Sequence, residues 1–127
     1  MDVLTSADLL LAGHDHIYER TQQFRTGPGC TTFSSTWANP ACVGGDGYGG
    51  SYTAGRGAVQ VISGVGGQSQ NTLAMGDPDW PYVVVANGRN SWSPADGYLR
   101  ITATPSALAA EFRATKGQFG DSFTIRR

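Results

Sequence analysis

The chain has 127 residues, of which 39% are hydrophobic and 18 are glycine, and its formal net charge is −1 at pH 7. This length suits one domain, and nine scattered Lys and Arg against ten Asp and Glu exclude the basic surface that nucleic-acid-binding proteins carry. The longest apolar run, around residues 9–12, is far shorter than the roughly 18 residues that span a bilayer, so we expect no membrane span.

The first predicted element is a short strand at residues 8–12 (DLLLA). A continuous apolar run that ends at Gly13 is typical of a strand buried on both faces of a parallel or mixed sheet. Residues 1–7 are predicted to be the tail of a helix, so we expect the chain to begin within an α/β unit. They carry no signal-peptide pattern, which indicates an intracellular protein or a missing true beginning.

Both histidines of the chain, His14 and His16, lie directly after this predicted strand and are separated only by Asp15. Ligands gather beyond the carboxyl ends of strands in α/β sheets. Histidine acts there as a general acid or base, or as a neutral nitrogen ligand to a metal ion. Asp15 either orients an imidazole or faces solvent. The alternative is that both histidines are polar loop residues without a ligand, since short motifs often match by chance.

Residues 26–57 are predicted to form a long loop, because they are rich in glycine, serine, threonine and asparagine and show no sustained period. Within this loop, Cys30 and Cys42 either form one disulfide or remain two free thiols. A zinc site is a weaker interpretation, because the chain has no CxxC spacing. Trp37 in this loop, like Trp80 and Trp92 in later ones, either covers the core or lines the rim of a binding surface.

Residues 57–67 (GAVQVISGVGG) predict a second buried strand, with its core at residues 59–62 and a glycine turn after it. Residues 71–80 show no clear period and are predicted to be irregular or weakly helical. Residues 82–88 (YVVVANG) have the propensity of a strand, but their closeness to Pro81 leaves an apolar loop as the alternative.

Residues 97–127 predict a three-stranded antiparallel meander, because apolar residues alternate with polar ones in three successive segments. Pro105 with Ser106 and Lys116 with Gly117 supply the two turns. No internal repeat is visible, and the chain needs no second domain. The side chains predicted to face inward are Leu99, Ile101, Ala103, Leu108, Ala110, Phe112, Phe123 and Ile125.

The segment LLLAGHDHIYERT at residues 9–21 resembles the last signature of the calcineurin-like metallophosphoesterases, in particular the GHxHxYER block of their purple acid phosphatase branch. The later order is similar as well, because a strand leads into GVGG at residues 64–67 and the chain closes with a DSFTI segment. The resemblance covers most of the chain except the loop at residues 27–57. The matching block residues are Gly13, His14, His16, Tyr18, Glu19 and Arg20.

This resemblance implies an α/β, β-rich chain that forms the C-terminal portion of a four-layer α/β/β/α sandwich with a dinuclear metal site. It implies that His14 ligates one metal ion and His16 the other, the ions being Fe paired with Zn, Mn or Fe. The resemblance further implies that a hydroxide on the metals would attack the phosphorus of a small phosphate monoester, while both ions would stabilise charge on the attacking and leaving oxygens. The same resemblance implies a secreted or periplasmic parent protein.

The chain departs from the family pattern, because the earlier metal-ligand motifs, of the types DxG, GDxxY, GNHE and an isolated His, are absent before GHDH. Two similar stretches, GDGYGGSY at residues 45–52 and GDPDWPY at residues 76–82, lack the required strand and spacing. Two imidazoles that serve different ions hold neither tightly without further protein ligands. We therefore expect residues 1–127 to be a single partial catalytic domain that binds metal weakly and is inactive alone.

The remaining residues of the block allow two interpretations each. Tyr18 either packs against the sheet with a hydrogen-bonded hydroxyl group or lines the substrate cleft. Glu19 and Arg20 alternate along an extended chain, which favours a structural ion pair or loop anchor, while phosphate contact by Arg20 is the alternative. Two other hypotheses for the whole chain stay open: a non-catalytic β-rich interaction module, and a truncated fragment without independent function.

Overall fold

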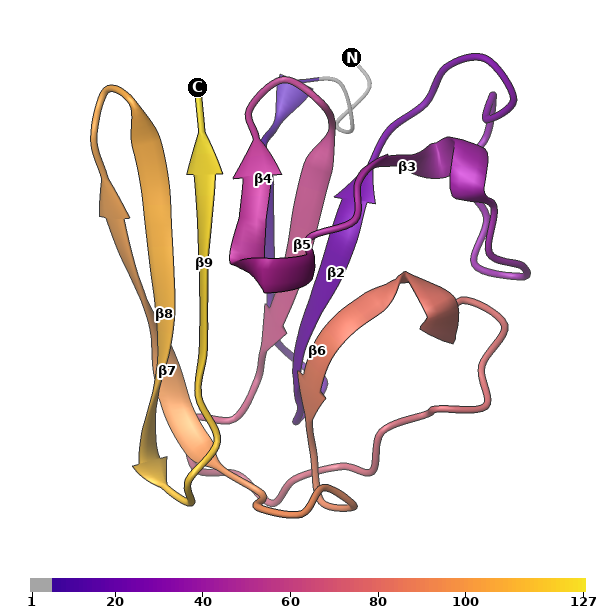
Figure 1. Cartoon of the computed structure of the whole chain (residues 1–127). Helices are drawn as coiled ribbons and strands as arrows, with labels where there is room; N and C mark the ends of the chain where they lie inside the picture. The colour runs from indigo at the N-terminus through magenta and orange to yellow at the C-terminus, as the bar shows by residue number, and fades with distance from the viewer. Residues whose placement is uncertain (1–5) are drawn as a thin grey trace.

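Two β-sheets face each other in the computed structural model, which describes residues 6–127 (Figure 1). The strands of the first sheet are β1 (Leu9–Ala12), β2 (Tyr18–Phe24), β3 (Val43–Gly45), β5 (Ala58–Ser63) and β6 (Val83–Asn87). β1 runs parallel to β5, and β5 runs antiparallel to β2. The other side of β2 pairs with β6 and then with β3. The predicted strands at residues 59–62 and 82–88 are thereby confirmed.

The second sheet contains the C-terminal strands. Its members are β4 (Ser51–Thr53), β7 (Asp96–Ala103), β8 (Ala107–Lys116) and β9 (Asp121–Arg126). β7, β8 and β9 pair in antiparallel succession, and β4 adds to β9 in the parallel sense. The predicted antiparallel meander over residues 97–127 is therefore confirmed.

Helical structure is scarce within residues 6–127. Between Leu9 and Arg127 the helical elements are the 3₁₀ turns η1 (Pro40–Cys42), η2 (Tyr48–Gly50) and η3 (Trp80–Tyr82). The prediction of a β-rich chain is thus confirmed, and its sheets are mixed. The predicted helix tail at residues 1–7 lies almost entirely outside the described residues. Over residues 6–127, no helix is long and apolar enough to cross a lipid bilayer.

β1 is a strand, as its apolar run predicts, but the prediction that it is buried on both faces is wrong. Among the described residues it pairs only with β5, which leaves it at the edge of the first sheet. Leu9 and Leu10 are half-buried, and Leu11 is 58% exposed. An edge strand has a neighbour on one side only, so its side chains are covered less than those of a central strand.

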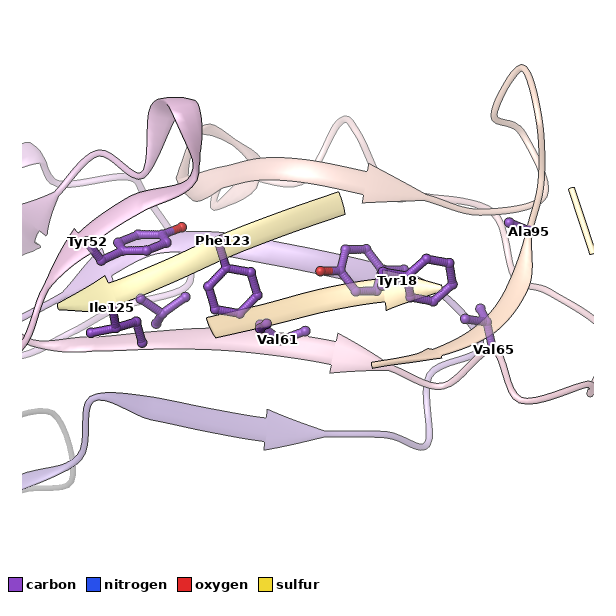
Figure 2. Packing of buried hydrophobic residues seen from close by; sticks show 10 residues of the cluster. Tyr18, Tyr52, Val61, Val65, Ala95, Phe123 and Ile125 are labelled. Carbon is purple, nitrogen blue, oxygen red and sulfur yellow. The ribbon is translucent and has the colours of Figure 1, made fainter. Parts of the chain in front are cut away.

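The hydrophobic core lies between the two sheets. Figure 2 shows Tyr18 and Val61 of the first sheet among the same cluster of side chains as Phe123 and Ile125 of β9. All four are buried, and full burial of one such side chain stabilises the fold by roughly 1.5–3 kcal/mol. The meander residues predicted to face inward lie at least half-buried, except Ala103, which is exposed at the end of β7 next to a turn.

β2 is a central strand of the first sheet, although its sequence did not predict a strand. Its residues, YERTQQF, are mostly polar, yet Arg20, Thr21 and Gln23 are buried. Hydrogen bonds offset the cost of burying them. The side-chain amide of Gln23, for example, donates to the carbonyls of Thr53 at 2.8 Å and Gly57 at 3.0 Å. A strand buried through polar side chains shows no apolar alternation, so the pattern did not reveal it.

Residues 26–57 are less irregular than predicted, because they contain η1, β3, η2 and β4. Cys30 and Cys42 are both buried and form a disulfide. Next to β2, Phe33 packs against Phe24 and Tyr82, with ring centroids 4.5 and 5.3 Å away. Of the two interpretations of the cysteines, the structure has the disulfide, which holds together a segment with little regular structure.

Candidate functional site

The loop at residues 13–17 leaves the carboxyl end of β1 and leads into β2. β5 ends beside it, because β1 and β5 run parallel and in register from Leu9 with Val59 to Ala12 with Ile62. His14 has a φ of 72°, and it is the only non-glycine residue with a positive φ within residues 6–127. Such a conformation costs about 1–3 kcal/mol and occurs preferentially at functional sites.

Gly64 and Asn71 fix the conformation of this loop. The N–H group of Gly64 donates to the carbonyl of Ile17 at 3.0 Å, and that of Asn71 donates to the carbonyl of His16 at 3.0 Å. A Cβ atom on Gly64 would lie 1.9 Å from the carbonyl oxygen of Asp15, so only glycine permits this approach. The histidine loop therefore rests on the chain that follows β5.

Asp15 supports the loop through Asn71. Its carboxylate oxygen Oδ1 accepts a hydrogen bond from the side-chain amide of Asn71 at 2.7 Å. The residue is exposed. Of the two roles considered for Asp15, orienting an imidazole and facing solvent, its exposure agrees with the second. The contact with Asn71 adds a third role, because it ties the loop to a segment 56 residues away.

His16 is held through its ring nitrogen Nδ1, which lies 2.9 Å from the carbonyl oxygen of Ser69. A carbonyl oxygen only accepts hydrogen bonds, so Nδ1 is the donor in this contact and Nε2 is the ring nitrogen left for another ligand. Histidine ligands of metal ions are commonly oriented by such a bond from their second nitrogen. His14, in contrast, is exposed and has no side-chain hydrogen-bond partner among the described residues.

The described residues supply only part of a metal site. No group of three or more His, Cys, Asp or Glu side chains within residues 6–127 is arranged to hold a metal ion. A structural zinc ion takes about four protein ligands and a catalytic one about three, so two histidines cannot complete the coordination of two ions. By itself this part of the chain does not fit the dinuclear centre that the family resemblance implies.

Tyr18 and Arg20 point into the space between the sheets and meet Asp121 at the start of β9. The guanidinium group donates two hydrogen bonds to the carboxylate, from Nε to Oδ2 at 2.8 Å and from Nη2 to Oδ1 at 3.0 Å. The hydroxyl group of Tyr18 donates to Oδ2 at 2.6 Å. The side chains of Arg20 and Asp121 are only 3% and 6% exposed, so they form a buried bidentate ion pair.

Tyr52 of β4 completes this network. Its hydroxyl oxygen accepts a hydrogen bond from Nη1 of Arg20 at 2.7 Å, and its hydroxyl proton is donated to the carbonyl of Thr21 at 2.7 Å. Nη1 also donates to the carbonyl of Gly47 at 3.1 Å. We call this network the buried clamp, and its side chains are Tyr18, Arg20, Tyr52 and Asp121.

The buried clamp connects the two sheets, and its side chains are buried. Burial raises the pKa of Tyr18 and of Tyr52, so both hydroxyl groups stay protonated. Burial opposes the charge of Arg20, but its hydrogen bonds to Asp121 and the nearby charges outweigh that effect and raise its pKa. Because Tyr18 and Arg20 are buried, the structure favours their structural interpretation over substrate contact.

Asp121 is the residue of this network that the sequence analysis missed. It lies 101 residues from Arg20, and its segment was interpreted only through Phe123 and Ile125. A signal was present, because two of the segments that carry the family resemblance, GHDHIYER and DSFTI, contain the base and the acid of this pair. Treating the two segments as neighbours in space would have suggested the ion pair.

Glu19 points to the opposite face of the first sheet, into a pocket of about 250 Å³ that we call the acidic pocket. Asp15, Asp77 and Asp79 line it as well, and no Lys or Arg of the described chain does. Burial raises the pKa of Glu19 from 4.5 to about 7, and the charges of Asp79, Asp15 and Asp77 add to the rise. Arg20 thus forms the predicted ion pair, with Asp121 as its partner. Glu19 forms no ion pair within residues 6–127.

Glu19→Gln should remove a pH dependence of stability. The folded chain binds the Glu19 proton more tightly than the unfolded chain does, so deprotonation favours unfolding. The free energy of unfolding should therefore fall as the pH rises from about 4.5 to 7. We expect a fall of about 1 kcal/mol, because solvent screens a partly buried carboxylate. Urea denaturation at about pH 5 and about pH 8 measures it.

The control for this prediction is Glu111→Gln, which removes a partly exposed carboxylate from β8. This variant should keep the pH dependence of the wild type between these pH values. If the Glu19→Gln variant also keeps it, the acidic pocket is not its source. If both variants lose it, the dependence comes from the overall charge of the chain and not from one pocket.

The three tryptophans do not cover the core. Trp92 is 91% exposed and Trp37 is 57% exposed. Trp80 is half-buried at the start of η3, where it lines the acidic pocket. Of their two predicted roles, the structure thus favours the one at a pocket for Trp80 and Trp92, since Trp92 lines another pocket together with Phe119.

The chain matches no family model, no curated protein and no solved structure. The family resemblance of the GHDHIYER segment therefore depends on the residues of this chain alone. The structure places the histidine loop at the ends of two parallel strands and orients His16 through Ser69. It also forms the buried clamp around Arg20 and Asp121.

Proposed function

We propose that the chain is the C-terminal part of a metal-dependent phosphoesterase that resembles purple acid phosphatases and hydrolyses phosphate monoesters. The observation that carries this proposal is the histidine loop at residues 13–17. It places His14 and His16 beyond the carboxyl ends of two parallel strands. The hydrogen bond to Ser69 leaves Nε2 of His16 available to a metal ion.

In this proposal the two sheets are the inner layers of a four-layer α/β/β/α sandwich. Two features support this assignment. The sheets share one core, as the inner layers of such a sandwich do, and β1 has an unpaired edge among the described residues that a further strand can extend. A helical layer on the outer face of the first sheet would also cover Glu19, whose carboxylate lies in a pocket there.

We assign His14 and His16 as ligands of two different metal ions, Fe paired with Zn, Mn or Fe. In this proposal the remaining ligands come from outside residues 6–127, where no group of three or more His, Cys, Asp or Glu side chains is arranged to hold a metal ion. Asp15 supports the loop through Asn71, and the buried clamp fixes β2, into which the loop leads. These supports hold the histidines in place without contact to the substrate.

Metal titration and hydrolysis of an aryl phosphate by the purified chain test this function. We expect weak binding of Zn²⁺ or Mn²⁺ that is lost in His14→Ala and His16→Ala, and little or no phosphatase activity. Glu111→Gln, which changes a residue of β8, should bind the metal as the wild type does. Metal binding that persists without both histidines would refute their role as ligands. Robust turnover that disappears in His14→Ala would refute the incompleteness of the site.

A non-catalytic interaction module is the second candidate function. It is favoured by Trp92, which is 91% exposed, and by the lack of a three-ligand group within residues 6–127. Tight stoichiometric binding of a partner, insensitive to chelators and to loss of both histidines, would support it. A truncated fragment without independent function is the third hypothesis, and a cooperative unfolding transition of the isolated chain would count against it.

A further inference from the structure

A pocket of about 480 Å³ opens between the loop that follows β5 and the adjoining ends of β7 and β8. We call it the basic pocket, and its lining includes residues 67–70, Arg89, Asp96 and Lys116. The side chains of Arg89 and Lys116 are exposed and make no hydrogen bond or ion pair within residues 6–127. Two cations without protein partners at one pocket favour an anionic ligand.

Asp96 does not neutralise these cations by an ion pair. Its carboxylate oxygen Oδ1 instead accepts a hydrogen bond from Nε2 of Gln70 at 3.1 Å. The other amide atom of Gln70, Oε1, is buried without a partner in the described chain. The pocket thus carries two positive charges against one negative charge, whereas no Lys or Arg lines the acidic pocket. The two pockets therefore favour ligands of opposite charge.

The basic pocket adjoins the histidine loop through the chain that follows β5. Ser69 lines the pocket, and its carbonyl oxygen accepts the hydrogen bond from Nδ1 of His16. The carbonyl of Asn71 accepts a hydrogen bond from the N–H group of Arg89 at 2.9 Å. Figure 1 shows the loops after β5 and β6 together at the lower end of the two sheets. The basic pocket and the histidine loop are therefore neighbours that share a contact with Ser69.

We propose that the basic pocket binds a phosphate group of a ligand whose second phosphate lies at the histidine loop. Arg89 offers a planar fork of donors and Lys116 a compact charge, and both groups suit phosphate. The second half of this inference rests on the proposed function, which places the hydrolysed phosphate near His14 and His16. The substrate class is then a phosphate monoester that carries a further phosphate group.

Inorganic pyrophosphate is the probe, titrated into the metal-free full chain at low salt and followed by calorimetry. The affinity should fall about tenfold or more in the Arg89→Ala/Lys116→Ala variant, because two charge-assisted contacts are lost. NMR signals of the amides at residues 67–70 should shift in the wild type and not in this variant. The matched control, Arg25→Ala/Arg56→Ala, removes the same charge from a different pocket and should bind within about twofold of the wild type.

Three results would overturn the proposal: no binding by the wild type, an unchanged affinity in the Arg89→Ala/Lys116→Ala variant, or an equal loss in the control. Circular dichroism shows whether each variant is folded. His14→Ala and His16→Ala leave Arg89 and Lys116 in place, so their loss of pyrophosphate affinity should be smaller than that of the Arg89→Ala/Lys116→Ala variant. Failed metal binding with intact pyrophosphate binding therefore refutes the phosphoesterase function alone. Intact metal binding with failed pyrophosphate binding would refute the proposal for the basic pocket alone.

Discussion

Asp121→Asn is expected to lower the free energy of unfolding by about 3 kcal/mol or more, because it leaves the charge of Arg20 buried without a counter-ion. The Arg20 side chain is 3% exposed, so it cannot reach solvent unless the two sheets separate. Tyr18 also loses the charged acceptor of its 2.6 Å hydrogen bond. Urea denaturation of the purified chain, followed by circular dichroism, measures the change.

Glu111→Gln is the matched control, since Glu111 also pairs with an arginine. Nη2 of Arg100 lies 3.1 Å from Oε2 of Glu111, but the side chains of Arg100 and Glu111 are 57% and 45% exposed. The substitution should therefore change the free energy of unfolding by about 0.5 kcal/mol or less. Equal losses in the Asp121→Asn and Glu111→Gln variants would contradict the role of the buried clamp as a main link between the sheets.

Replacing Cys30 and Cys42 together with serine is expected to lower the free energy of unfolding by about 3 kcal/mol. The disulfide joins residues with a sequence separation of 12, and its loss gives the unfolded chain more conformations. Both cysteines are 1% exposed. The serine hydroxyl groups would therefore be buried on folding, which destabilises the variant further. Urea denaturation under oxidising conditions compares the variant with the wild type.

Reduction of the wild type separates these two effects, because it opens the disulfide without adding hydroxyl groups. The reduced wild type should show most of the loss seen in the Cys30→Ser/Cys42→Ser variant. That variant has no cysteine left, so its own stability should not respond to the reductant. A wild type whose stability is the same with and without reductant would show that the disulfide contributes nothing to folding.

β5 and the C-terminal meander could be predicted because their signals are local. Val59 and Val61 lie in a β-branched run between glycines, and both are fully buried. Phe112 and Phe123 occur in segments whose apolar residues alternate, and both face the core. In each case the side chains within one segment specify the strand and the face that it buries.

β1 and β2 show where this local reasoning fails. The apolar run of β1 predicts a strand correctly, but its burial depends on how many neighbours the sheet provides, and β5 is its only partner among the described residues. β2 is buried through Arg20, Thr21 and Gln23, whose hydrogen-bond partners lie on other strands and loops. Its polar sequence therefore resembles that of a loop.

Local sequence patterns specify the strand segments other than β2, β3 and β4, the two histidines after an apolar run, and a cysteine spacing that permits a disulfide. The partners of the key side chains depend instead on how distant parts of the chain pack. The tertiary structure placed Asp121 against Arg20 across 101 residues, and the carbonyl of Ser69 against His16. It also placed the side chain of Glu19 in a pocket that three aspartates line. The physical reason is that alternation specifies which face a side chain takes, whereas the packing and register of distant strands decide what lies opposite it.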